Sequence, residues 1–258
     1  MNLQLSGKRA LVTGGSRGIG KAVAHALASE GVRVVICSRN LEEITKAATE
    51  LSKSTSSDVY GVHADMGNHL SIKALLLETI ANLGGLDILV NNAARVSGGP
   101  TPDSLLEGND ELLRYDFETK MLGYVRAARE AAPQMMKNRW GRIINISSPG
   151  STKVLNNYFS IGVSKAALES ITRYMAFDLA HKGINVNSIS SSLVETDAIK
   201  HFPNQSEIKE ILSRRNPKQK KLITEDIAKA AVMLCTEESE MIVGQNILVD
   251  GGDTLLLR

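Results

Sequence analysis

A glycine-rich turn near the start of the chain carries the clearest chemical signal. It reads Thr13-Gly14-Gly15-Ser16-Arg17-Gly18-Ile19-Gly20 and stands between an apolar run, Arg9–Thr13, and a helical pattern, Gly18–Glu30. Glycines allow a tight turn and close approach to a ligand, and the free N–H groups of the following helix bind anions. A strand–turn–helix context is what a pyrophosphate cradle requires. The turn predicts a dinucleotide site, and a βα turn without a ligand is the alternative. The predicted contacts are Gly14, Ser16, Arg17, Gly18, Ile19 and Gly20.

The end of the second apolar run predicts which dinucleotide binds. The run Val32–Cys37 is followed by Ser38-Arg39-Asn40, with no acidic residue. An acidic side chain there would accept from the ribose 2′-hydroxyl of NAD, whereas an arginine pairs with the 2′-phosphate of NADP. Arg17, Ser38 and Arg39 therefore predict NADPH/NADP, because a guanidinium can bind a phosphate through two hydrogen bonds. The alternative is two unrelated surface arginines.

The spacing of Gly14, Gly18 and Gly20 resembles the TGxxxGxG signature of the short-chain dehydrogenase/reductase family. The resemblance extends over nearly the whole chain. Asn91-Asn92-Ala93-Ala94 is similar to the NNAG motif of the family, and Gly141–Ser148 is similar to the strand that carries its active-site serine. The resemblance implies further cofactor contacts from Asp65, Met66, Asn91, Ala93, Lys165 and Thr196. Taken alone, Asp65 and Thr196 could equally cap the helices that follow them.

The expected proton donor is displaced along the chain. In most of the family a tyrosine precedes a lysine by four residues, and a serine lies thirteen residues before that tyrosine. Here Ser148 and Lys165 keep these places, Ile161 stands in the tyrosine place, and Tyr158 lies seven residues before the lysine. An offset of seven keeps both side chains on one helical face. The phenol would thus be displaced by about one turn, or ~4.5 Å.

The Tyr-x6-Lys spacing resembles the enoyl-acyl-carrier-protein reductases, most closely the NADPH-dependent type III form. This resemblance implies hydride transfer from NADPH to Cβ of an enoyl thioester, with acyl-carrier protein as the partner that carries the thioester. Tyr158 would bind the carbonyl oxygen and help protonate the enolate. Lys165 would hold the nicotinamide ribose and lower the pKa of the tyrosine. Ser148 would orient the substrate, or would only end its strand.

Two other functions stay open from the sequence. The first is a carbonyl reductase acting on a 3-oxoacyl group or a ketone. The second is an NADP-binding protein without turnover, because two positions that are catalytic in the family carry other residue types. Ile161 replaces the tyrosine, and Lys120 replaces an asparagine. A second cation close to Lys165 would disfavour protonation of that lysine. Ser191-Ser192 also replaces the Pro-Gly of the family.

Alternating apolar runs and helical patterns predict the elements that position these residues. An α/β fold follows: a single Rossmann-type doubly wound domain over residues 1–258, with a seven-stranded parallel sheet and helices on both faces. Two irregular segments interrupt the pattern, the loop Ser97–Gly108 and a substrate-covering segment at about 190–221. The expected strands are Arg9–Thr13, Val32–Cys37, Val59–His63, Leu86–Val90, Arg142–Ile146, Ile184–Ile189 and Gln245–Val249. The expected helices are Gly18–Glu30, Leu41–Ser52, His69–Leu83, Asp116–Lys137, Asn157–His181 and Thr224–Cys235.

Composition narrows the classes of partner. The net charge of +2 over 258 residues argues against nucleic acid, and no apolar run approaches the 18 residues of a membrane span. The absence of a leader pattern predicts a cytoplasmic protein. The histidines lack the spacing of metal ligands, and Cys37 and Cys235 are expected to be buried thiols. Lys218, Lys220 and Lys221 predict a solvated face or a docking patch for an acidic partner. The family resemblance implies a homotetramer.

Overall fold

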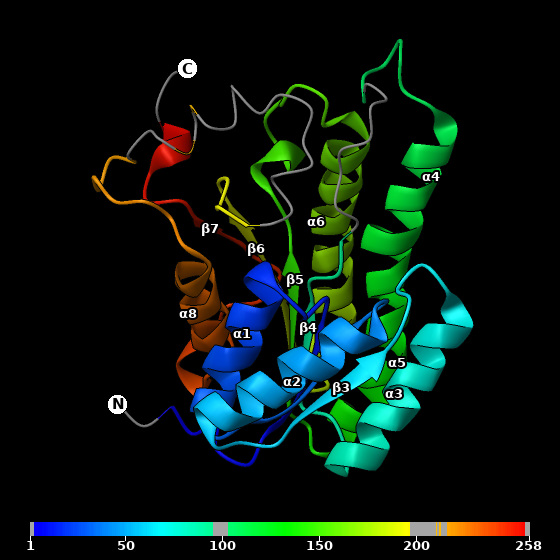
Figure 1. Ribbon diagram of the computed structural model, residues 1–258, viewed down its shortest axis with the longest axis vertical. Coiled ribbons are helices and arrows are strands. Elements are labelled where there is room, and N and C mark those ends of the chain that lie inside the picture. Colours follow the sequence, from blue (N-terminus) through cyan, green and yellow to red (C-terminus); the bar gives the residue numbers. More distant parts are fainter. Residues whose placement is uncertain (1–2, 95–102, 197–209, 211, 213–215, 256–258) are drawn as a thin grey trace.

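A computed structural model describes residues 3–94, 103–196, 210, 212 and 216–255. These residues form one seven-stranded parallel sheet in the order β3-β2-β1-β4-β5-β6-β7 (Figure 1). The strands are β1 Arg9–Thr13, β2 Arg33–Ser38, β3 Val59–His63, β4 Ile88–Asn91, β5 Gly141–Ile146, β6 Ile184–Ser191 and β7 Asn246–Val249. The strand order reverses between β1 and β4, which is where open α/β sheets leave a crevice for a ligand. The predicted fold class is confirmed.

Helices cover both faces of the sheet (Figure 1). They are α1 Gly18–Ser29, α2 Leu41–Thr55, α3 His69–Leu83, α4 Asp110–Phe117, α5 Gly123–Lys137, α6 Phe159–Ala180 and α8 Thr224–Leu234. A π-helical turn, η1 Glu118–Leu122, joins α4 to α5. Short 3-10 turns occupy Pro149–Ser151, Glu237–Ser239 and Asp253–Leu255.

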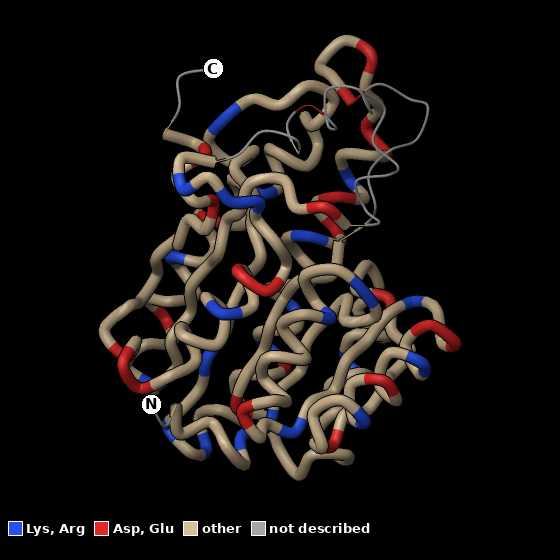
Figure 2. Tube along the Cα trace, turned by 60° about the vertical axis from the view of Figure 1, so that its left-hand side comes forward, with Lys and Arg blue, Asp and Glu red and all other residues tan. Residues whose placement is uncertain are grey.

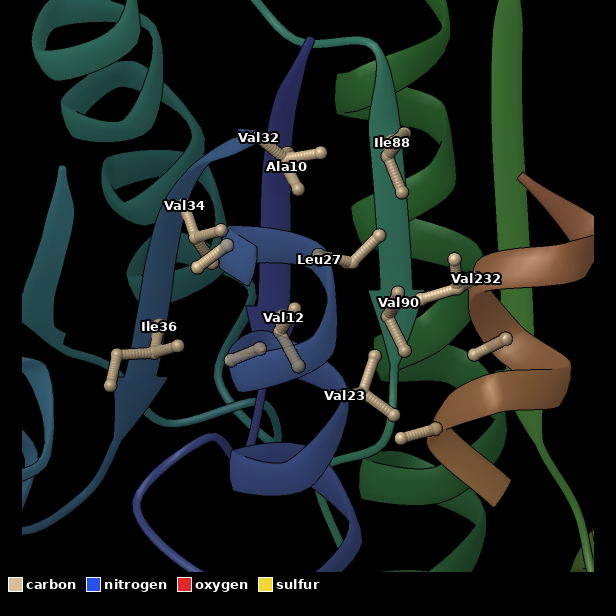
Figure 3. Close-up of a cluster of buried hydrophobic side chains, with 14 of the residues drawn as sticks. Ala10, Val12, Val23, Leu27, Val32, Val34, Ile36, Ile88, Val90 and Val232 are labelled. Carbon is tan, nitrogen blue, oxygen red and sulfur yellow. The ribbon is translucent and has the colours of Figure 1, made fainter. Parts of the chain in front are cut away.

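Two apolar cores lie on opposite faces of the sheet, and the alternation of strand residues explains both. In β1, Ala10 and Val12 point to the core under α1, α2 and α8, while Leu11 points to the core under α3 and α5. Figure 3 shows the first core, where Leu27 of α1 lies over β1 and β4 with Val232 of α8 nearby. Strands that are buried on both faces need the continuous apolar runs seen in the sequence.

The charged residues and the two cysteines lie where the sequence predicts them. Basic and acidic positions are interspersed along most of the described trace (Figure 2). Lys218, Lys220 and Lys221 are exposed to solvent. Cys37 and Cys235 are free and buried, as expected, and burial raises the pKa of each thiol to about 12. Within the described part of the chain, no helix is both long and apolar enough to span a membrane.

Two helices begin at other residues than expected. The helix expected from Asp116 starts at Asp110, because the Asn109 side chain accepts a hydrogen bond from the Leu112 N–H (2.8 Å) and caps it. The helix expected from Asn157 starts at Phe159, because Asn157 has a φ of +55°, which no right-handed helix contains. Tyr158 therefore lies just before α6 and not within it.

The long irregular segments are described only in part. The loop Ser97–Gly108 is described from residue 103, and of the segment of about 190–221 the described residues are 190–196, 210, 212 and 216–221. The prediction that this second segment covers a substrate therefore falls mostly outside the described residues. Thr196 is the last described residue before the gap at 197–209.

The core predicts a large loss of stability from one truncation in α1. Leu27 is fully buried, so Leu27→Ala should lower the free energy of unfolding by about 2–5 kcal/mol, since a cavity remains. Leu70→Ala is the matched control, because Leu70 is 77% exposed and should change little. Urea unfolding followed by circular dichroism measures both. Equal effects of the two substitutions would contradict the assigned core.

Candidate functional site

A cavity of about 900 Å³ opens at the carboxyl ends of the strands, where the strand order reverses. Most of the residues predicted from the sequence line it. They are Gly14, Ser16, Arg17, Gly18, Ile19, Ser38, Arg39, Asp65, Met66, Ala93, Ser148, Tyr158, Lys165 and Thr196. Among the described residues, Gly20 and Asn91 were also predicted as contacts, but neither is part of this lining.

The glycine turn has the geometry of an anion cradle. Gly14 and Gly18 have φ values of +67° and +58°, which favour glycine. A Cβ on Gly20 would lie 2.3 Å from the Gly14 carbonyl oxygen, so Gly20 allows the turn to close although it does not face the cavity. Helix α1 begins at Gly18 without a side-chain cap and without an acidic residue in its first turn. Its first N–H groups and positive dipole end are therefore available to an anion.

Hydrogen bonds between the ends of β1 and β4 hold this turn. The Thr13 hydroxyl oxygen accepts from the Asn92 and Ala93 N–H groups, each at 3.0 Å. The Asn92 amide donates in return to the carbonyl oxygens of Thr13 (3.0 Å) and Gly14 (3.1 Å). Asn91 points away from the cavity and donates to the Asn145 side chain of β5 (2.9 Å). The sequence motif therefore acts through Asn92, which the sequence analysis did not select.

The two arginines lie at one end of the cavity. Arg17 and Arg39 are both exposed and both line it. The Arg39 guanidinium donates to the Tyr115 hydroxyl of α4 (2.9 Å), and the Ser38 hydroxyl donates to the Asn40 carbonyl oxygen (3.0 Å). Tyr115, also in the lining, was missed by the sequence analysis, because it lies 76 residues from Arg39 and belongs to no motif.

Asp65 lies in the cavity wall after β3. Its carboxylate accepts from the Gly67 N–H (2.9 Å), while Asn68 caps α3 by accepting from the Ser71 N–H (3.0 Å). The alternative that Asp65 caps this helix is therefore wrong. The carboxylate fixes a tight turn in the wall of the cavity instead.

Two hydroxyl groups meet at the other end of the cavity. The Tyr158 hydroxyl donates to the Ser148 hydroxyl oxygen at 3.3 Å. Burial raises the pKa of Tyr158, and the negative charge of Asp116 adds to this effect. The expected lowering of this pKa by Lys165 is therefore not found. Ile161 fills the place where the family carries its tyrosine, and it is buried in the cavity wall.

Lys165 of α6 carries a buried amino group. It donates to the Ile146 carbonyl oxygen and lies over the Tyr124 ring, 5.2 Å from its centre. Burial, and in second place the positive charge of Lys120, lower the pKa of Lys165 to about 7, while the negative charges of Asp116 and Glu169 oppose the shift. The expected effect of a second nearby cation is thus present.

Lys120 lies in the π-helical turn η1 and forms an ion pair with Asp116 at 2.7 Å. Both side chains are only 1% exposed, and Lys120 lines the cavity. Glu169 is buried on α6 and accepts hydrogen bonds from Ser147 (2.6 Å) and Ser190 (3.3 Å). Neither carboxylate was selected from the sequence, because only the fold brings them to the lysines.

The residues present fit a nicotinamide dinucleotide. The glycine turn leaves no room for a Cβ at Gly14, Gly15 or Gly20. The start of α1 is open to an anion, and the cavity lining includes two arginines and a buried lysine. Within the described ranges, no group of three or more His, Cys, Asp or Glu side chains could hold a metal ion.

Comparison with known proteins agrees with this geometry. Residues 14–254 match a family model described as enoyl-(acyl carrier protein) reductase. The chain is 33% identical to the 7α-hydroxysteroid dehydrogenase of Escherichia coli K12 over 251 residues, which cover 97% of this chain and 96% of the relative. It is also 33% identical to a 3-oxoacyl-[acyl-carrier-protein] reductase of Staphylococcus aureus Mu50 over 253 residues, 95% and 97% of the two chains.

A solved structure of similar shape is the L-sorbose reductase of Gluconobacter frateurii complexed with NADPH and L-sorbose. It superposes with a TM-score of 0.90 at 28% identity, and the match covers 100% of both chains. With the glycine turn, the seven-stranded sheet and these relatives in agreement, the chain belongs to the short-chain dehydrogenase/reductase family of oxidoreductases.

Proposed function

We propose that this oxidoreductase uses NADPH to reduce the 2,3-double bond of an enoyl thioester. The observation that carries the proposal is the place of the phenol: Tyr158 stands before α6 and Ile161 fills the expected tyrosine place. A ketone receives hydride and proton at adjacent atoms. An enoyl thioester receives hydride at Cβ, while charge develops on a carbonyl oxygen several bonds away. A hydroxyl group displaced along the cavity suits the second case better.

The roles of the side chains follow from their surroundings. A reduced nicotinamide, when bound, supplies the hydride. Tyr158 hydrogen-bonds the thioester oxygen and helps to protonate the enolate that hydride addition leaves, since its raised pKa keeps the phenol protonated and able to donate. Ser148, whose hydroxyl oxygen lies 3.3 Å from the Tyr158 hydroxyl, helps to orient the thioester oxygen. Lys165 holds the nicotinamide ribose from the buried side of the cavity.

NADPH is preferred over NADH in this proposal because of Arg17, Ser38 and Arg39. All three line the cavity, and the strand end that carries Ser38 and Arg39 has no acidic residue. The L-sorbose reductase complexed with NADPH supports this choice. Two acidic residues, Glu43 on the first turn of α2 and Asp65 after β3, also line the cavity.

The second candidate is reduction of a carbonyl group, of the 3-oxoacyl or ketone type. The names of the two curated relatives favour it over the first candidate, since one is a 3-oxoacyl-[acyl-carrier-protein] reductase and the other a hydroxysteroid dehydrogenase. The Tyr158 and Ser148 hydroxyls would then both donate to the carbonyl oxygen under reduction. The acyl-carrier protein, the homotetramer and the cytoplasmic location stay predictions in both cases.

A substrate comparison tests the two candidates. Purified protein with NADPH should oxidise the cofactor faster with the crotonyl than with the acetoacetyl thioester of coenzyme A. Tyr158→Phe should lower kcat for the crotonyl thioester by about 100- to 1,000-fold, because it removes a donor to the developing oxyanion. Its affinity for NADPH should not change. Stopped-flow absorbance and cofactor titration measure these quantities.

A double variant supplies the control for this comparison. Tyr158→Phe/Ile161→Tyr returns a phenol to the place usual in the family, and it should gain acetoacetyl reduction relative to Tyr158→Phe alone. Faster acetoacetyl reduction by the unmodified protein would select the carbonyl candidate. NADPH binding with no turnover of either thioester would reject both.

The cofactor preference depends on Arg39. Arg39→Ala should raise the KM for NADPH by roughly 10- to 100-fold, because a charge-assisted hydrogen bond to the 2′-phosphate is lost. The KM for NADH should stay nearly unchanged. Tyr115→Phe is the matched control, because it removes the hydrogen bond to Arg39 but keeps the guanidinium. Equal changes of both KM values in Arg39→Ala would contradict pairing with a 2′-phosphate.

The Lys165 ammonium predicts a pH dependence. Its pKa in the free protein is about 7, against an ordinary value of 10.5, so the charged form is lost as the pH rises through 7. The value of kcat/KM for NADPH reports the free enzyme and should fall over that range. Lys120→Met should move the midpoint to higher pH, and Asp116→Asn should move it to lower pH, because the two charges act in opposite directions. Shifts in the same direction would contradict this electrostatic arrangement.

A further inference from the structure

Tyr158 has to be held in place by groups outside its own helix. It is the N-cap residue of α6, with φ −131° and ψ 17°, and its side chain makes no capping hydrogen bond. The preceding Asn157 has a φ of +55°, so the chain turns sharply just before the phenol. The orientation of a side chain at such a boundary depends on the groups that fix the first turn of the helix.

Asp103 fixes that turn from a distant part of the sequence. Both of its carboxylate oxygens lie 3.1 Å from the Ser160 backbone nitrogen, and Oδ1 accepts from the Ser160 hydroxyl at 2.6 Å. Its main-chain carbonyl oxygen accepts from the Phe159 N–H at 3.3 Å. Asp103 therefore accepts hydrogen bonds from the backbone N–H groups of both residues that directly follow Tyr158. It lies 57 positions before Ser160 in the sequence.

The Asp103 carboxylate is itself held firmly. Its residue is 7% exposed, and the carboxylate stands at the N-terminus of a 22-residue helix, where the helix dipole favours negative charge. Removing the carboxylate would leave the Ser160 N–H and hydroxyl groups without this hydrogen-bond partner in a buried place, which would destabilise this turn. The first turn of α6 would then rearrange, and Tyr158 would move with it.

Gly150 limits the phenol ring on its other side. A Cβ on Gly150 would lie 2.6 Å from both Cδ1 and Cε1 of Tyr158, a distance too short for any side chain. The same Cβ would lie 3.3 Å from the Ser148 hydroxyl oxygen. The ring thus occupies the space that a side chain at position 150 would need, and its direction is set jointly by this space and by the start of α6.

We propose that Asp103 is a positioning residue, which holds the Tyr158 hydroxyl beside Ser148 by capping α6 from the loop after β4. The inference rests on the proposed function, in which Tyr158 donates to the substrate oxygen. It assigns a task to a buried carboxylate that lies outside every motif of the sequence and outside the cavity lining.

A double-mutant cycle tests the role of Asp103. Asp103→Ala should lower kcat for the reducible thioester by roughly 10- to 100-fold, because even a small displacement of a catalytic group lowers the rate of the chemical step. The Kd for NADPH should stay the same. In the Tyr158→Phe background, the same substitution should lower the residual kcat by less than about threefold, since no hydroxyl remains to be positioned. Asp103→Asn, which keeps one acceptor for Ser160, should recover part of the loss.

Asn68→Ala is the matched control, because it removes the side-chain cap of α3 and leaves α6 intact. It should leave kcat unchanged. Ser160→Ala replaces Asp103→Ala if that variant fails to fold, since it deletes only the 2.6 Å hydrogen bond. It should lower kcat in the same Tyr158-dependent way.

The outcomes separate the inference from the proposed function. Equal losses of kcat with and without the Tyr158 hydroxyl would overturn the positioning role, as would full activity of Asp103→Ala beside an impaired Tyr158→Phe. Full activity of Tyr158→Phe would overturn the proposed function and the inference with it.

Discussion

The reciprocal hydrogen bonds between the ends of β1 and β4 are the constraint on which the site depends. The Thr13 hydroxyl accepts two backbone N–H groups, and the Asn92 amide returns two hydrogen bonds to the glycine turn. The strand order reverses at this point, so the two strands lead their loops to opposite sides and leave a crevice. Without these bonds the turn at Gly14 could not stay open above the sheet while α1 directs its N-terminus into the cavity.

Burial of charge shapes the other end of the cavity. Lys165 and Lys120 are both buried, and Asp116 and Glu169 lie close enough to affect the pKa of Lys165. While Lys165 is protonated, two positive and two negative charges balance, which makes their burial tolerable, because an isolated buried ion costs several kcal/mol. The π-helical turn η1 places Lys120 in the cavity wall, and such turns often occur at functional sites.

The sequence predicted the regular parts of the molecule better than the site. Apolar runs and helical periods are local signals, so all seven strands and the glycine turn were found within a few residues. The start of α6 was wrong by two residues, because the φ of Asn157 depends on tertiary contacts. Asp103 and Tyr115 were missed for the same reason: each acts on a residue more than fifty positions away. Asn91 was predicted to contact the cofactor, but the next residue of the same motif, Asn92, makes the hydrogen bonds that hold the glycine turn.

The close approach of Gly150 to the Tyr158 ring links two positions that stand eight residues apart in the sequence. A larger side chain at position 150 and the phenol ring in its present place exclude one another, because they would occupy the same space. The two residues are therefore one structural unit, and a tyrosine grafted at the corresponding place of a relative should be accepted only together with a glycine.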